Sequence, residues 1–217
     1  MKVSLETQLR QGADEMGLSL TDVQVHHLLA YQALIEKWTQ VYNLTALRSP
    51  EDILTHHVQD SLAVIKPLEH QLEQAGINST PLRLLDAGSG AGLPGVVIAI
   101  CCPHITVHGV DSVAKKAAFI QQVAITLKLP NLAGLHARVE HLTDTYHVIT
   151  SRAFASLPDL TTLTLAALAE NGIWMAMKGQ HPTDELAALP GSIHVFHTET
   201  LQVPGLKANR CLIWMKP

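Results

Sequence analysis

The 217-residue sequence lacks several features that would place it in a membrane or outside the cell. It contains no apolar run of the roughly 18 to 20 residues that a membrane-crossing helix needs. Its first twenty residues mix polar and apolar side chains, a pattern that does not predict a secretory signal. The three cysteines form no Cys-x-x-Cys pair, which favours free thiols in a reducing compartment. We therefore expect a soluble, cytoplasmic protein.

Metal-binding patterns are also missing, although the sequence has 13 histidines. His26 and His27, like His56 and His57, are adjacent residues whose side chains diverge on a helix. The His-Glu-x-x-His pattern of metalloproteases is absent. The sequence therefore predicts no metal site.

Positive charge is scarce as well, because the formal net charge is −4. Phosphate contacts supply most of the nonspecific affinity for nucleic acids, and they need Lys or Arg. This balance argues against a general polyanion binder. If the substrate is RNA, basic residues have to be concentrated in one part of the surface.

The first part of the chain follows a helical pattern. Apolar residues recur at helical spacing over 5–44, where Thr21-Asp22 is a helix start signal, and a further helix is predicted over 49–68. Residues 76–81 are typical of a linker. We expect an amino-terminal helical extension, residues 1–75, packed on a domain of residues 80–217.

After residue 81, short apolar runs alternate with helical ones. Strands are predicted at 82–85, 105–110, 132–137, 148–150 and 173–177, and helices at 95–102, 113–127, 157–170 and 183–189. Segments 193–197 and 211–215 favour a closing hairpin. The alternation predicts an α/β fold, a Rossmann-like doubly wound sheet whose ligands bind beyond the carboxyl ends of the strands.

The most specific local signal is the segment 86–95, Asp-Ala-Gly-Ser-Gly-Ala-Gly-Leu-Pro-Gly, which leaves the first strand and enters a helix. Its glycines permit positive φ and remove Cβ atoms, so a ligand can approach the backbone. Asp111 ends the next strand, where its carboxylate can accept hydrogen bonds from an adenosine ribose or cap the following helix. Leu93-Pro94-Gly95 replaces the helix start that receives a pyrophosphate, which favours S-adenosylmethionine over a dinucleotide. Asp86 orients the loop or contacts the cationic end of that cofactor.

Three later strand ends carry polar residues. Arg138-Val139-Glu140 can border an adenine ring, and Ser151-Arg152-Ala153-Phe154-Ala155 faces the first glycine loop across the switch point of the predicted sheet. Arg152 is the favoured basic residue of the site, and an ion pair with Glu140 is its structural alternative. Lys178, after the fifth strand, can meet a phosphate or simply end the strand.

Together these motifs resemble the bacterial ribosomal RNA small subunit methyltransferase G family, also called glucose-inhibited division protein B. The resemblance runs from about residue 20 to the end of the chain, and its Gly-Leu-Pro-Gly and Ser-Arg-Ala-Phe strings are more specific than the glycines alone. His147 departs from the family pattern, where many members carry an aspartate. The motifs that carry the resemblance are Asn43-Leu44-Thr45, His57-x-x-Asp60-Ser61-Leu62, the loop 86–95, Asp111-Ser112 with Lys115-Lys116 and Phe119, Arg138-Val139-Glu140 and Ser151-Arg152-Ala153-Phe154.

The resemblance implies methyl transfer from S-adenosylmethionine to N7 of the guanine at position 527 of 16S ribosomal RNA. The partner is then 16S RNA or the small ribosomal subunit, and we expect a monomer. Guanine N7 has a lone pair and no proton, so no general base is needed and positioning dominates catalysis. Arg152 and Lys178 are candidates for holding the guanine O6 edge or a flanking phosphate. The resemblance implies that Gly88, Leu93, Val139, Glu140 and Arg152 line the cofactor site, to which the loop pattern adds Gly90 and Asp111.

Other interpretations stay open at this point. Arg48, Lys115 and Lys116 are expected to form a local basic rim, or they are simply solvated helix charges. An NAD-dependent oxidoreductase would use the same loop and Asp111, but it needs a proton-transfer residue and a substrate domain that the sequence does not show. A methyltransferase of another acceptor and a non-catalytic ribosome-binding module share the fold, because a fold does not set the substrate.

Overall fold

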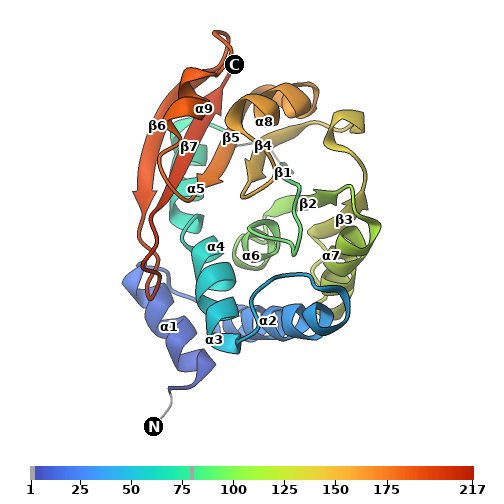
Figure 1. Cartoon of the computed structure of the whole chain (residues 1–217), viewed down its shortest axis with the longest axis vertical. Coiled ribbons are helices and arrows are strands. Elements are labelled where there is room, and N and C mark those ends of the chain that lie inside the picture. Colours follow the sequence, from blue (N-terminus) through green and yellow to red (C-terminus); the bar gives the residue numbers. More distant parts are fainter. Residues whose placement is uncertain (1–2, 79–80) are drawn as a thin grey trace.

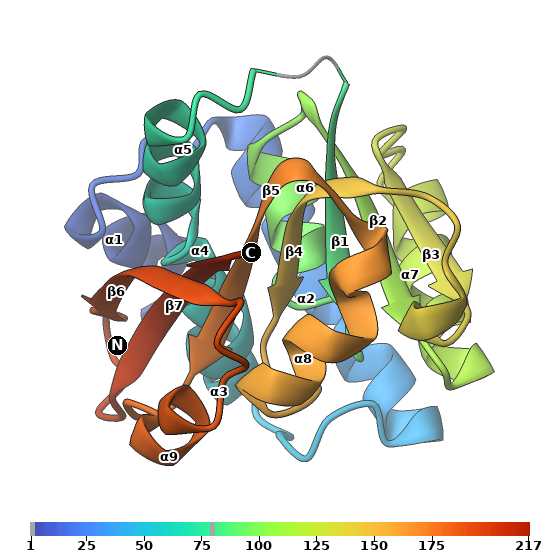
Figure 2. The ribbon, with the colours of Figure 1, turned by 90° about the horizontal axis from the view of Figure 1, so that it is seen from above.

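A seven-stranded sheet runs through the centre of the protein in the computed structural model, which describes residues 3–78 and 81–217 (Figure 1). The strands lie side by side in the order β3-β2-β1-β4-β5-β7-β6 (Figure 2). They are β1 (Leu82–Ala87), β2 (Ile105–Asp111), β3 (Leu132–His136), β4 (Tyr146–Ser151), β5 (Leu168–Lys178), β6 (His194–Leu201) and β7 (Arg210–Lys216).

Neighbouring strands from β3 to β5 are parallel, whereas β7 pairs antiparallel with both β5 and β6. This arrangement confirms the predicted Rossmann-like α/β fold, and the β6–β7 pair confirms the closing hairpin. The chain moves outward in opposite directions from β1 and from β4. A switch point therefore lies between the carboxyl ends of these two strands, where ligands bind in sheets of this kind.

Helices precede the sheet, as predicted. The first are α1 (Leu5–Glu15) and α2 (Asp22–Tyr42), followed by α3 (Pro50–Ile53), the π-helical segment η1 (Leu54–Gln59), α4 (Asp60–Leu62) and α5 (Ile65–Gln74). Helix α2 starts where the sequence predicts, because Thr21 and Gln24 form a reciprocal capping box. The helical stretch predicted over 49–68 is present, but it is divided, because η1 is π-helical and a turn at 63–64 separates α4 from α5. Insertions of π-helix are frequent at functional sites, and here η1 precedes Asp60 of the site described below.

The two faces of the sheet carry different helices. Between the strands lie α6 (Gly95–Cys101), α7 (Ala114–Thr126), α8 (Leu157–Thr164) and α9 (Thr183–Ala187), with short 3₁₀ turns η2 (Val139–His141) and η3 (Leu165–Ala167). The amino-terminal helices share one apolar core with α6 and α7, in which Leu28, Val96 and Phe119 are fully buried. Helix α8 packs on the opposite face, where Leu160 joins a cluster around Trp174. Figure 1 shows α8 and α9 on one side of the sheet and α2 and α6 on the other.

The division into an extension of residues 1–75 and a domain of residues 80–217 stays a prediction, although both parts contribute to the same apolar core. Residues 79 and 80 of the predicted linker lie outside the described residues. Among the helices that the structure describes, none combines the length and apolar character needed to cross a membrane.

The helix predicted over 157–170 ends earlier than its pattern indicates. Helix α8 stops at Thr164, and β5 already begins at Leu168. The Thr164 hydroxyl donates to the Leu160 carbonyl at 2.6 Å and accepts from the indole N–H of Trp174 at 2.8 Å. This tertiary contact from β5 overrides the helical pattern. The helix predicted over 183–189 likewise ends early, at Ala187.

Candidate active site

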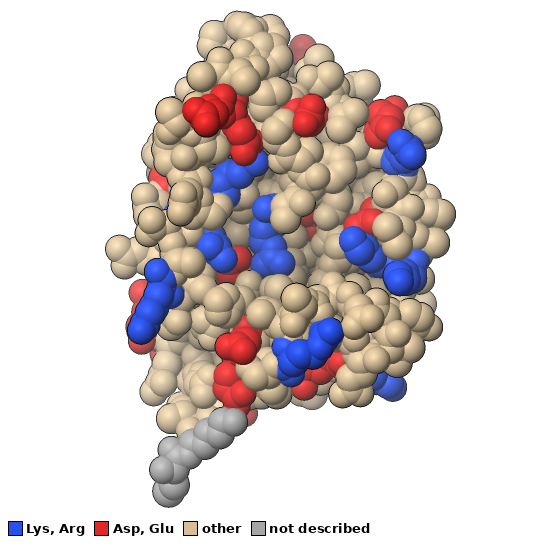
Figure 3. All heavy atoms as spheres, in the orientation of Figure 1, with Lys and Arg blue, Asp and Glu red and all other residues tan. Residues whose placement is uncertain are grey.

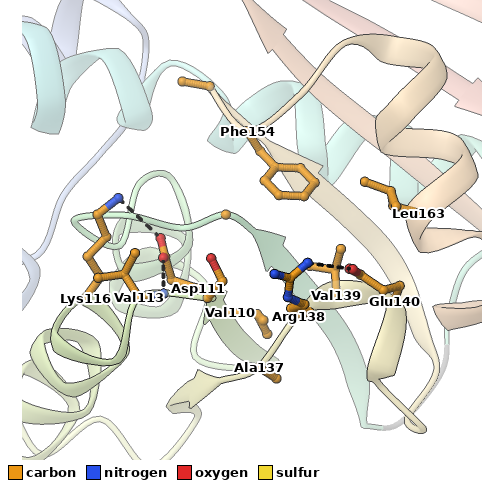
Figure 4. A pocket seen from close by; sticks show the side chains of 13 residues that line it. Val110, Asp111, Val113, Lys116, Ala137, Arg138, Val139, Glu140, Phe154 and Leu163 are labelled. Atoms are coloured by element: carbon orange, nitrogen blue, oxygen red, sulfur yellow. Dashed lines mark hydrogen bonds and ion pairs between the residues drawn. The ribbon is translucent and has the colours of Figure 1, made fainter.

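A pocket of about 460 Å³ opens beyond the carboxyl ends of β1 to β4 (Figure 4). Its volume lies within the range of about 300 to 1,000 Å³ that is usual for small-molecule sites. We call it the cofactor pocket. It is lined by Gly88, Val110, Asp111, Ser112, Val113, Lys116, Ala137, Arg138, Val139, Glu140, Ala153, Phe154 and Leu163.

The first glycine of the loop closes one side of this pocket. Gly88 has a φ of +63°, and a Cβ atom there would overlap the ring of Phe154. Figure 4 shows the Phe154 ring reaching into the pocket from the segment after β4. The segment after β4 thus faces the first glycine loop, as predicted. Only glycine fits this position, because both its backbone conformation and its neighbour exclude a side chain.

Asp111 does two things at the end of β2. Its Oδ1 accepts a hydrogen bond from the Val113 N–H at 2.9 Å, and its Oδ2 accepts one from the Gly90 N–H at 3.0 Å. The Lys116 ammonium lies 3.7 Å from Oδ2. Helix α7 has no side-chain cap, so Asp111 fixes the turn before the helix rather than capping it. The carboxylate stays at the pocket wall, where further lone pairs can accept ribose hydroxyls.

Asp86 faces the loop from inside the protein. It is fully buried, and its Oδ2 accepts hydrogen bonds from the Ser89 hydroxyl and from the Gly95 N–H, the latter at 3.0 Å. Burial raises the pKa of this carboxyl to about 6, against the opposing effect of those hydrogen bonds. The geometry supports the loop-orienting interpretation of Asp86 over contact with the cofactor.

The wall after β3 combines apolar and acidic groups. Val139 is buried beneath the pocket, and the Glu140 carboxylate lies 3.7 Å from the guanidinium of Arg138. Apolar side chains on this side suit a purine ring, while Asp111 and Glu140 provide acceptors for hydroxyl or amino groups and negative charge for a cationic ligand. The apolar and acceptor groups that line the pocket therefore fit S-adenosylmethionine.

A second pocket, of about 450 Å³, adjoins the first through Ala153. It lies over the carboxyl ends of β4 and β5 and is covered by the loop after α2 and by η1. We call it the arginine pocket. Its lining residues are Thr45, Ala46, Leu47, His56, His57, Asp60, Arg152, Ala153, Met177, Lys178, Gly179 and Arg210.

Asp60 organises the arginine pocket. Only 1% of this side chain is exposed, and it accepts from Nε of Arg210 at 2.7 Å and from NH1 of Arg152 at 3.2 Å. Arg152 also donates to the His56 carbonyl at 3.1 Å. The predicted alternative, an ion pair between Arg152 and Glu140, is wrong, because β4 directs Arg152 toward η1 and α4 instead. The sequence motifs include Asp60 without a role and miss Arg210, whose place depends on β7 folding back beside β5.

His57 lines the same pocket as a neutral side chain. Burial, followed by the charge of Arg152, lowers its pKa to about 4. Its Nε2 is hydrogen-bonded to the Thr45 hydroxyl at 2.8 Å, which ties the loop after α2 to η1. The ring therefore holds the loop at neutral pH and adds no charge to the pocket.

Lys178 closes the far side of the arginine pocket. Its ammonium donates to Glu185 at 2.7 Å and to the Ala155 carbonyl at 3.1 Å. Lys and Arg side chains gather in and around a hollow on this face of the molecule (Figure 3). Of the predicted rim residues, Lys115 and Arg48 are exposed, and Arg48 donates to Asn43 and to the Thr45 carbonyl. Positive charge is thus local, as expected for a chain of net negative charge, but carboxylates neutralise much of it.

The structure brings some of the predicted cofactor residues together and separates others. Gly88, Asp111, Val139 and Glu140 line the cofactor pocket. Three others do not. Gly90 supports the pocket through Asp111, Leu93 is buried in the apolar core, and Arg152 lines the arginine pocket. Within residues 3–78 and 81–217, no group of three or more His, Cys, Asp or Glu side chains is placed to hold a metal ion.

The fold and the cofactor pocket define a class of protein. A solved coclaurine N-methyltransferase, described as bound to N-methylheliamine and SAH, superposes with a TM-score of 0.56 over 99% of this chain and 96% of its own, at 11% identity, which shows a common fold. The protein therefore has a Rossmann-like fold, and the lining of its cofactor pocket fits S-adenosylmethionine.

The particular family follows from the sequence comparisons. A family model described as rRNA small subunit methyltransferase G matches residues 24–213, and the chain belongs to this family. A ribosomal RNA small subunit methyltransferase G of Albidiferax ferrireducens is 63% identical over 98% of this chain and 97% of its own length. Its counterpart from Polaromonas naphthalenivorans is 58% identical over 99% and 96%. The family resemblance seen in the motifs is thereby confirmed.

Proposed function

We propose that this chain transfers the methyl group of S-adenosylmethionine to N7 of the guanine at position 527 of 16S ribosomal RNA. The names of its relatives support an acceptor in small-subunit ribosomal RNA. The observation that carries the proposal is the contact between the two pockets at Ala153, which places a basic cavity directly beside the cofactor pocket. A guanine in the arginine pocket would meet a methyl donor in the cofactor pocket.

The chemistry demands little from the side chains. The bound cofactor supplies an electrophilic methyl group on a positively charged sulfur. Guanine N7 offers a lone pair without a proton, so no general base has to act. The residues of the two pockets therefore act by orientation, holding nucleophile and methyl carbon about 3 to 3.5 Å apart and in line. His57 agrees with a mechanism that needs no general base. It is neutral, with a pKa lowered to about 4, but its Nε2 is already hydrogen-bonded to the Thr45 hydroxyl.

Arg152 is the residue best placed to hold the acceptor. Its guanidinium has five N–H donors, and its bonds to the His56 carbonyl, Asp60 and His57 engage three of them. The remaining donors can bind the guanine O6 or a flanking phosphate, groups that arginine binds well. Lys178 contributes less, because Glu185 already holds its ammonium.

The test is methylation of small ribosomal subunits that lack this modification, using labelled S-adenosylmethionine and mapping the labelled nucleotide. We expect label at this guanine N7 alone. In an Arg152→Ala variant the methylation rate should fall about 100-fold, corresponding to about 3 kcal/mol of lost positioning energy. Arg10→Ala is the matched control, because Arg10 pairs with Glu6 and Asp22 on the surface and lines neither pocket.

Two results would contradict the proposal. An unchanged rate in Arg152→Ala would remove Arg152 from acceptor binding. Cofactor binding without transfer to RNA would point to another acceptor or to a non-catalytic ribosome-binding module. A monomeric enzyme working in the cytoplasm, on 16S RNA or on the small subunit, is part of the same proposal.

A further inference from the structure

Tyr31 connects an amino-terminal helix to the glycine-rich loop of the cofactor site. It lies in the middle of α2 and is fully buried. Its hydroxyl donates to the carbonyl of Ala91 at 2.5 Å, across 60 residues of sequence. No sequence motif pointed to this residue.

The loop around Ala91 depends on a few such anchors. Gly90 and Gly92, on either side, have φ values of +59° and +86°, a conformation that other residues rarely adopt. The Ser89 hydroxyl donates to Asp86, and the Gly90 N–H donates to Asp111. Tyr31 supplies the anchor from outside the Rossmann-like part of the chain. A Cβ atom at Gly92 would lie 3.3 Å from the Tyr31 hydroxyl, tighter than an ordinary van der Waals contact, so loop and helix pack closely.

Helix α2 also packs on the helix that follows Asp111. The ring of Tyr31 lies 6.4 Å from that of Phe119 in α7, and Trp38 meets Phe119 edge-on at 5.2 Å between centroids. Helix α7 begins three residues after Asp111. Helix α2 thus contacts both the loop after β1, whose Gly90 N–H donates to Asp111, and the middle of α7, the helix that follows Asp111.

We infer that Tyr31 is a positioning residue for S-adenosylmethionine. Helix α2 does not line the cofactor pocket, but through Tyr31 it holds the loop that does. The Tyr31 hydroxyl holds the Ala91 carbonyl, which keeps the Gly90 N–H on Asp111 and fixes that carboxylate for the ribose. Without the hydroxyl, the loop samples other conformations, and the cofactor has to order it on binding. The inference concerns cofactor binding and goes beyond the proposed RNA acceptor.

The first experiment is a Tyr31→Phe variant of the full chain, with binding of S-adenosylmethionine and S-adenosylhomocysteine measured by calorimetry. We expect dissociation constants raised about three- to tenfold, which corresponds to one hydrogen bond lost from a preorganised loop. Under turnover, KM for S-adenosylmethionine should rise by a similar factor while kcat at saturation is kept. Wild-type protein that binds neither ligand would contradict the cofactor assignment itself, which is a different result.

Two controls separate positioning from general destabilisation. Tyr42→Phe removes the same hydroxyl group from an exposed position on the same helix, and its affinity should equal that of the wild type. Leu28→Ala creates a cavity in the core one turn before Tyr31 but keeps the Tyr31 hydroxyl, so it should lower the free energy of unfolding and leave cofactor affinity unchanged. Unchanged affinity in Tyr31→Phe, or equal loss in Leu28→Ala, would overturn the inference.

A measurement on the unmodified protein gives an independent check. Coupling is reciprocal, so cofactor that orders the loop must also stabilise α2 through Tyr31. Hydrogen exchange of the α2 amides near Tyr31 should slow when S-adenosylhomocysteine is added, and it should slow more than exchange in α5, which packs on the same face of the sheet. Equal protection of α2 and α5 would overturn the inference even if Tyr31→Phe failed to fold.

Discussion

The cofactor pocket and the arginine pocket are neighbours of similar volume, but they handle charge in opposite ways. The cofactor pocket places its carboxylates, Asp111 and Glu140, on the wall, and the cations near them are 3.7 Å away. The arginine pocket buries its carboxylate, Asp60, beneath two arginines at 2.7 and 3.2 Å. One pocket thus offers acceptors to a cationic nucleoside, and the other offers donors to an electron-rich base or a phosphate.

The difference shows how a chain of net negative charge can bind both a cation and RNA. A buried carboxylate does not repel a phosphate as an exposed one would, because the arginines above it screen its charge and use it as a fixed support. Asp60 therefore lowers the positive potential of the arginine pocket only a little, and it holds the side chains of Arg152 and Arg210 in one geometry. The comparison predicts that substitutions in the two pockets will have separable effects.

The largest expected effect comes from Asp60→Ala in the arginine pocket. Removing one partner of a buried ion pair leaves uncompensated charge, which typically costs about 3 to 5 kcal/mol of stability. Arg152 and Arg210 keep 23% and 21% of their side chains exposed, so we expect a loss of about 2 to 3 kcal/mol in urea unfolding. Methylation should be lost, while cofactor affinity changes little. The control is Asp52→Ala, an exposed carboxylate of α3. Full stability and activity in Asp60→Ala would show that the buried carboxylate does not hold the arginine pocket together.

A smaller effect, this time on cofactor affinity, is expected for Asp111→Asn in the cofactor pocket. Both carboxylate oxygens already face backbone N–H groups, so an amide turns a donor toward one of them and weakens the acceptor for the ribose. Hydrogen bonds to a charged group are worth about 1.5 to 3 kcal/mol, and the dissociation constant for S-adenosylmethionine should rise about 30-fold in calorimetry. Asp144→Asn, which changes only a surface pair with Arg83, serves as the control. Unchanged affinity would remove Asp111 from the site.

The smallest effect is a pair of opposite pH dependences. The pKa of His57 is lowered to about 4, so the unfolded chain binds its proton more tightly and its stability contribution rises with pH between about 4 and 6.5. The pKa of Asp86 is raised to about 6, so its contribution falls as pH rises from about 4 to 6. Each change corresponds to about 3 kcal/mol across its window, but the two have opposite signs and largely cancel in the wild type, so the net change is small.

Variants separate the two groups. The stability advantage of the wild type over His57→Gln should grow between pH 4 and 6.5, whereas its advantage over Asp86→Asn should shrink between pH 4 and 6. Unfolding free energies measured across this range test both signs. Parallel curves for a variant and the wild type would mean that the corresponding group keeps an ordinary pKa in the folded protein.

Much of the cofactor pocket could be predicted from the sequence, because its residues follow strand ends at short range. Gly88 and Asp111 come directly after or at the end of β1 and β2, and parallel strands bring their carboxyl ends together. The arginine pocket could not be predicted in this way. Asp60 and Arg210 are 150 residues apart, and their contact requires α4 to lie beside the start of β7, which pairs with β5 inside the sheet.

Element boundaries show the same limit. The apolar pattern over 157–170 is helical throughout, yet the indole of Trp174 binds Thr164 and the chain enters β5 at Leu168. The π-helical segment η1 also has no periodic signal of its own. At Thr164 the tertiary contact outweighs a local preference of a few tenths of a kcal/mol per residue.

The sequence by itself determined the α/β alternation, the glycine-rich loop with Asp111 and the family, because these depend on local periodicity and on short motifs in order. Only the tertiary structure decided that Arg152 joins Asp60 and Arg210 in a separate pocket and that Tyr31 of α2 holds the loop. Contacts of that kind join residues far apart in the chain. They depend on the directions in which packed elements point their side chains, which no local pattern encodes.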